Sequence, residues 1–131
     1  MNRLHAPMHK QGRGGLAHIL DAFRYSMQGL YAAWRNEIAF RLQCALLVVL
    51  LPAAFWIARS PVELAVMLGA CVLVLVAEMF NSAIESVVDR FGEELHPLSG
   101  QAKDLGSAGV FLGMMLFLVI WLPIAWSRFA P

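Results

Sequence analysis

Three long runs without a charged residue constrain what this chain can fold into. The runs are Leu42 to Ala58, Leu64 to Ala77 and Leu105 to Ser127. A helix needs about 20 mostly apolar residues to cross a bilayer, because each residue adds only about 1.5 Å of length. Hydrophobic residues make up 60% of the 131 positions, whereas soluble domains average roughly 45–50%. We therefore predict an all-α membrane protein with transmembrane helices near residues 38–58, 62–89 and 104–127.

The segment before the first run has a helical period of its own. Leu16, Ile19, Leu20 and Phe23 recur at the spacing of one helix face, and polar residues take the other positions. Beside a transmembrane helix, this pattern is typical of a helix that lies at the membrane surface. We predict such an amphipathic surface helix over residues 16–35. Residues 1–15 are predicted to be a flexible tail, and residues 16–131 a single membrane domain.

The basic residues are unevenly divided between the two sides of the predicted spans. Eight of the ten lie in the N-terminal stretch or the 90–103 connection, and only Arg59 and Arg128 lie on the opposite side. Because positive charge accumulates on the cytoplasmic side, the N-terminus and the 90–103 connection are predicted to be cytoplasmic in a multi-pass protein. The net charge of +1 gives no sign of a nucleic-acid partner.

A stripe of polar side chains crosses the end of the second span. Glu78, Asn81, Glu85 and Asp89 fall on one face of a helix. Ionisable groups within a membrane are costly and usually mark a function. Glu78 would lie about 6 Å inside the cytoplasmic boundary, where its carboxylate is poorly hydrated and could take a proton from a lipid hydroxyl. The alternative is that the stripe only forms hydrogen bonds between helices.

The other acids and one lysine suggest a site for a metal and a phosphate. Glu85 would lie about 10 Å nearer the cytoplasm than Glu78, and Glu37 opens the first span at a similar level. Two carboxylates at one depth could share Mg²⁺, and Lys103 with the amides that open the third span could face phosphate. The alternatives are an ordinary acid at a helix N-terminus for Glu37 and an interfacial lysine for Lys103.

Three motifs resemble those of the bacterial integral-membrane diacylglycerol kinases. They are Ala32 to Arg41, Glu78 to Asp89 and His96 to Ala108, within a resemblance that runs from about Ala17 to Trp126. The resemblance implies a homotrimer in the bacterial inner membrane with active sites between subunits. It also implies MgATP-dependent phosphorylation of diacylglycerol to phosphatidic acid.

The same resemblance implies roles for individual residues. Glu78 would be the general base, Asn81 would position the reacting groups, and Glu37 and Glu85 would hold Mg²⁺ and the nucleotide phosphates. The nucleotide site would also include Tyr25, Glu94, His96, Lys103 and Asp104. The lipid site, with Glu78, would include Ser26, Trp34, Arg41, Ser107 and Trp121. The chain departs from familiar members at His18, Gln28, Tyr31, Gln43 and Phe80, and Gln43 stands where an acid is familiar.

Three other functions compete with this one. An undecaprenol kinase would share the architecture, and the motifs separate the two lipid substrates poorly. An ion conduit would need polar groups through the far leaflet, and Leu64 to Ala77 offers none. A non-catalytic membrane subunit would not explain why three motifs gather at one cytoplasmic level.

Overall fold

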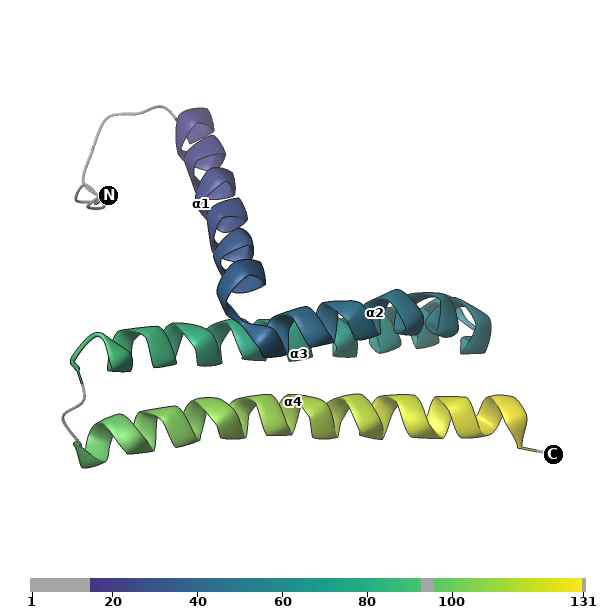
Figure 1. Cartoon of the computed structure of the whole chain (residues 1–131). Helices are drawn as coiled ribbons and strands as arrows, with labels where there is room; N and C mark the ends of the chain where they lie inside the picture. The colour runs from purple at the N-terminus through teal and green to yellow at the C-terminus, as the bar shows by residue number, and fades with distance from the viewer. Residues whose placement is uncertain (1–14, 93–95, 131) are drawn as a thin grey trace. The chain divides into compact units, whose positions relative to one another are not determined.

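The computed structural model describes residues 15–92 and 96–130, and it is helical almost throughout. The helices in these residues are α1 (Gly15–Asn36), α2 (Ile38–Ile57), α3 (Pro61–Asp89) and α4 (Pro97–Phe129) (Figure 1). The predicted all-helical fold is therefore confirmed. Residues 1–14, which hold most of the expected flexible tail, and Glu94 lie outside the described residues. The chain forms two compact units, and the boundary between them lies between Ala32 and Ala33.

The first unit contains most of α1, and its apolar residues are exposed. Leu16, Ile19, Leu20 and Phe23 each expose more than 60% of their surface. They occupy positions i, i+3, i+4 and i+7, which places them on one face of the helix. That exposed apolar stripe is the property expected of a helix that rests against lipid.

The second unit holds three helices that are long and apolar enough to cross a membrane, namely α2, α3 and α4. Three membrane-crossing helices were predicted, and this part of the prediction is confirmed. The long helices α3 and α4 have 29 and 33 residues. Because about 20 residues suffice to cross the hydrocarbon layer, both extend beyond it.

Local signals explain where α3 and α4 begin. Before α3, the Ser60 hydroxyl accepts a hydrogen bond from the Glu63 amide (3.2 Å), and the Glu63 carboxylate accepts one from the Arg59 amide (2.7 Å). Before α4, the His96 Nδ1 atom accepts from the Leu98 amide (3.2 Å), and Pro97 opens the helix. These caps place the start of α4 seven residues before the apolar segment expected from residue 104, because a polar first turn can be helical without entering the membrane.

Helix α3 is the centre of the second unit, and its most extensive contact is with α4. Figure 1 shows α3 and α4 side by side along most of their length. Gly106 of α4 permits this close approach. A Cβ atom on Gly106 would collide with the Asn81 side-chain oxygen, whereas one on Gly113 would make ordinary van der Waals contact with the Ala77 Cβ at 3.7 Å.

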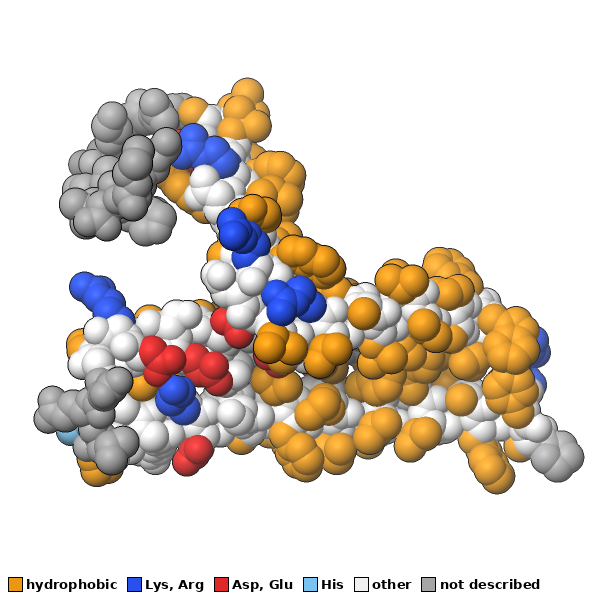
Figure 2. Space-filling view, viewed as in Figure 1, with side chains coloured by type: hydrophobic (Ala, Val, Ile, Leu, Met, Phe, Trp, Pro, Cys, Tyr) orange, Lys and Arg blue, Asp and Glu red, His pale blue; other side chains and the backbone are white. Residues whose placement is uncertain are grey.

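The apolar core of this unit lies toward the α2–α3 turn. Its buried members are Ala54, Ile57, Met67, Ala70, Cys71 and Trp121. The Trp121 indole N–H donates to the Met67 carbonyl over 3.2 Å, which satisfies the polar atom of a buried aromatic side chain. At the same end, the Arg59 guanidinium donates to the Arg128 carbonyl (2.9 Å). Figure 2 shows acidic side chains gathered toward the opposite end of the bundle, where α3 ends and α4 begins.

Candidate active site

In the described part of the chain, Glu78 is the charged residue that is buried. Only 6% of its surface is exposed. It lies on α3, and the Gln43 side-chain amide on α2 donates a hydrogen bond to its Oε2 atom over 3.1 Å. An isolated buried carboxylate is strongly destabilised, and a hydrogen-bond donor reduces that cost. The contact engages one carboxylate oxygen, so the other is available to accept a proton.

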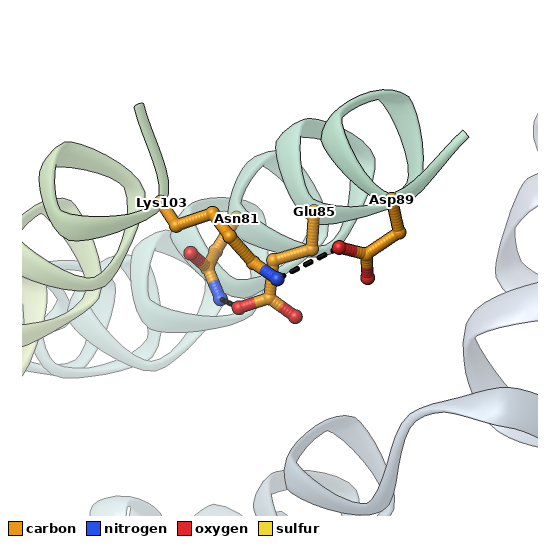
Figure 3. Close-up of polar contacts among 4 residues, drawn as sticks. All are labelled: Asn81, Glu85, Asp89 and Lys103. Atoms are coloured by element: carbon orange, nitrogen blue, oxygen red, sulfur yellow. Dashed lines mark hydrogen bonds and ion pairs between the residues drawn. The ribbon is translucent and has the colours of Figure 1, made fainter. Parts of the chain in front are cut away.

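Asn81 and Glu85 form the next layer of the site, toward the end of α3. The Asn81 Nδ2 atom donates to Glu85 Oε1 over 3.0 Å (Figure 3). The two side chains are four residues apart, a spacing that brings them together on one helix face. This bond fixes one oxygen of the half-buried Glu85 carboxylate and leaves its second oxygen for a cation.

The other polar atom of Asn81 has no protein partner among the described residues. Its Oδ1 atom is buried and makes no hydrogen bond there. It lies against Gly106 of α4, at the place where a Cβ atom would sit. A buried acceptor without a partner is unusual in a native protein and often lies at a functional site.

Asp89 and Lys103 form the outermost layer. The Lys103 ammonium reaches from α4 to the Asp89 carboxylate on α3, over 2.8 Å (Figure 3). Both side chains are substantially exposed, at 41% and 64%, so the pair contributes little to stability. Its consequence is geometric, because it places a cation one helical turn beyond Glu85.

The polar face of α3 thus runs from a buried acid to an exposed one. Glu78 is buried, Glu85 is half-buried and Asp89 is exposed. Seven residues separate Glu78 from Glu85, which is about 10 Å along a helix. This gradient is the arrangement expected for a helix that leaves the membrane between the two glutamates.

Glu37 and Arg41 lie at the break between α1 and α2. Glu37 is the extended residue that precedes α2, and its side chain makes no capping bond to that helix. The Arg41 guanidinium donates to the Trp34 and Arg35 carbonyls, each over 3.1 Å. Arg41 therefore braces the chain at the break, and the half-buried Glu37 carboxylate is not used for capping.

The remaining predicted residues are distributed over several elements. Lys103, Asp104 and Ser107 lie within about one turn of each other on α4, and His96 caps its start. Trp121 lies in the apolar core beside Met67, which is about 16 Å along α3 from Glu78. Tyr25 and Ser26 belong to the first unit, where the Ser26 hydroxyl donates to the Ala22 carbonyl. Trp34 is half-exposed at the end of α1.

The predicted magnesium ligands are the carboxylates of Glu37 and Glu85. In the described residues, no three His, Cys, Asp or Glu side chains gather closely enough to form a protein-only metal cage. Magnesium commonly uses one or two carboxylates and completes its octahedron with water and substrate phosphates. Glu85 has a second carboxylate oxygen that Asn81 does not engage, and the Glu37 carboxylate does not cap α2. Both carboxylates therefore suit that pattern.

The hydrogen bond between Gln43 and Glu78 was not predicted from the sequence. Gln43 stood out only as a departure from a familiar pattern, yet it bonds Glu78 across 35 positions of the chain. It also lines an apolar cavity of about 280 Å³ between α2, α3 and α4. The spacing within either helix could not reveal this pair, because hydrophobic periodicity does not say which residues of two helices face each other.

Comparison with known proteins identifies relatives along most of the chain. Residues 24–125 match the family model described as prokaryotic diacylglycerol kinase. A diacylglycerol kinase of Pseudomonas aeruginosa is 46% identical over 119 residues, which cover 91% of this chain and 97% of the relative. One from Haemophilus influenzae is 44% identical over 107 residues, covering 82% and 91%. One from Escherichia coli is 40% identical over 115 residues, covering 88% and 94%.

Proposed function

The chain belongs to the prokaryotic diacylglycerol kinase family, and from that membership we propose that it transfers the γ-phosphate of ATP to the hydroxyl of diacylglycerol. The products are phosphatidic acid and ADP. One observation supports this assignment most strongly. A buried glutamate, Glu78, lies on a helix long and apolar enough to span the membrane, about 10 Å from a second acid nearer the helix end.

In the proposed reaction, Glu78 is the general base. The lipid hydroxyl gives its proton to the Glu78 carboxylate oxygen that does not accept the hydrogen bond from Gln43. The hydroxyl oxygen forms a bond to the γ-phosphorus, and the bond from that phosphorus to the β–γ bridging oxygen breaks. A positioned base contributes about 10²–10⁴-fold to such a reaction. The remaining acceleration comes from positioning and from neutralising phosphate charge.

Glu85 and Glu37 would hold Mg²⁺, which supplies charge neutralisation to the nucleotide phosphates when bound. Asn81 supports this role because its amide holds Glu85 by one oxygen. Lys103, which lies one turn beyond Glu85 through its pair with Asp89, would supply a second positive charge to the phosphates.

The outer parts of both substrate sites follow the family resemblance. By that resemblance, the nucleotide would be bound by Tyr25, Glu94, His96 and Asp104. The lipid would be bound by Ser26, Trp34, Arg41, Ser107 and Trp121.

We further propose that the protein works as a homotrimer in the bacterial inner membrane, with its N-terminus and the 90–103 connection in the cytoplasm. The distribution of Lys and Arg supports this orientation. Three spans form a thin bundle, too small to enclose two substrates alone, which supports assembly with further copies.

A phosphate-transfer assay tests the function directly. The protein is supplied in mixed micelles with labelled ATP, Mg²⁺ and either diacylglycerol or undecaprenol, and labelled lipid is measured. We expect diacylglycerol to be the better substrate and Glu78→Gln to remove most turnover while ATP still binds.

Glu63→Gln is the matched control, since it makes the same change on the same helix about 22 Å away and keeps an oxygen for the cap at Arg59. Transfer mainly to undecaprenol would reassign the substrate. A Glu78→Gln rate near that of the control would remove Glu78 as the base.

A further inference from the structure

We propose that Gln43 is a positioning residue that holds the Glu78 carboxylate in its working orientation, an inference that rests on the proposed function. The Gln43 Nε2 atom donates to Glu78 Oε2 over 3.1 Å, from α2 to α3. Glu78 is buried, so bulk water does not readily replace this donor. The bond therefore determines which carboxylate oxygen is engaged and which is presented to the lipid hydroxyl.

The chemistry of an amide suits this task. The terminal torsion of a glutamate side chain is broad, so a buried carboxylate without a donor would sample many orientations. An amide N–H donates a hydrogen bond and has no proton to give up near neutral pH. Gln43 thus orients Glu78 without competing with it for the proton of the lipid hydroxyl.

A carboxylate at position 43 would behave differently. An ionised acid has no donor for Glu78, and two carboxylates this close would have to share a proton. The amide avoids that coupling. Gln43 is thus suited to keep Glu78 as an independent proton acceptor.

The surroundings of Gln43 argue that it is not present for packing. Its Oε1 atom is buried and has no hydrogen-bond partner in the described parts of the chain. The cavity that it lines is otherwise apolar, with Leu46, Leu47 and Met114 among its walls. A buried acceptor without a partner destabilises a fold, and an apolar side chain of similar size would avoid that cost. The favourable contact that Gln43 makes here is the one to Glu78.

The proposal predicts a loss of rate without a comparable loss of stability. Gln43→Met conserves volume and removes both amide atoms. We expect kcat for diacylglycerol phosphorylation to fall about ten- to a hundredfold, the scale for a misplaced catalytic group, with KM for MgATP unchanged. We expect stability in detergent to change little, because leaving Glu78 without its donor is offset by removing the unpartnered Oε1 atom of Gln43.

Leu47→Met is the matched control, since it lines the same cavity one turn further along α2 and should keep kcat. A second comparison uses the double variant of Gln43→Met with Glu78→Gln. It should be no slower than Glu78→Gln alone, because a positioning residue has nothing left to position.

If Gln43→Met fails to fold, Gln43→Asn replaces it, since the shorter amide keeps the polarity but no longer reaches Glu78. Unchanged kcat in the folded variant, or a further loss in the double variant equal to that of Gln43→Met alone, would overturn the proposal. The kinase assay of the unaltered protein keeps the two questions separate. Failure there removes the proposed function, whereas failure only in the Gln43 series removes the positioning role.

Discussion

Adding one methyl group at Gly106 should displace Asn81 and disable the site. A Cβ atom built on Gly106 collides with the Asn81 Oδ1 atom and comes within 3.4 Å of its Cγ atom. The Asn81 amide is the flexible partner, so it is the group that moves. Moving it breaks its hydrogen bond to Glu85.

The expected free-energy change follows from two opposing terms. Replacing glycine by alanine inside a helix stabilises it by about 0.8–1.0 kcal/mol. Losing a hydrogen bond to a charged group costs about 1.5–3 kcal/mol. Gly106→Ala should therefore lower the free energy of unfolding by about 0.5–2 kcal/mol. Its kcat should fall at least tenfold, because Asn81 no longer orients Glu85.

Gly109→Ala is the matched control for this change. Gly109 lies three residues further along α4, and in the described parts of the chain nothing lies within 4 Å of a Cβ atom placed there. It should gain about 1 kcal/mol from helix propensity and keep full activity. Unfolding by sodium dodecyl sulfate in mixed micelles and lipid phosphorylation are measured for both variants. Equal activity of the two would refute the reasoning, as would a Gly106→Ala protein as stable as its control.

Two further predictions test other layers of the molecule. Glu85→Gln and Glu37→Gln should each raise the Mg²⁺ concentration for half-maximal activity about tenfold or more, whereas Asp89→Asn should not; unchanged Mg²⁺ titrations would remove the ligand roles. Trp121→Phe should lower the midpoint of thermal unfolding, because it removes the hydrogen bond to Met67 and some buried area, and it should raise KM for diacylglycerol, because we assign Trp121 to the lipid site. Lower stability with an unchanged lipid KM would limit Trp121 to the core.

The helices could be predicted from the sequence because their signals are local. The uncharged runs and the helical period of residues 16–35 are patterns of neighbouring residues, so a single pass along the chain finds them. The start of α4 at Pro97 was missed by seven residues, because apolarity marks the membrane segment whereas capping marks the helix. In a helix that begins outside the lipid, the start of the helix and the start of the membrane segment are different residues. Hydrophobicity marks only the start of the membrane segment.

The candidate site could be predicted in part for the same reason. Glu78, Asn81 and Glu85 share one face of one helix, so their spacing was enough to group them. Asn81 and Glu85 do form a hydrogen bond. The Gln43 to Glu78 contact joins two helices, and nothing in the periodicity of either sets their relative rotation. The roles that depend on a nucleotide, a metal or further copies of the chain remain predictions.

The two halves of helix α3 have different roles. One half packs in the apolar core and the other carries the polar residues of the site, and the same positions could not do both. From Met67 to Cys71 it contributes buried apolar side chains to the core, and this half can be optimised for packing. From Glu78 onward it carries a buried acid and the unpartnered Asn81 oxygen. Such groups lower stability and are typical of functional sites, not of packed cores. Because about 16 Å separates Met67 from Glu78, the core can hold the helices together while the site keeps polar groups that a core would exclude. Substitutions near Trp121 should therefore act on stability, and those near Glu78 should act on rate.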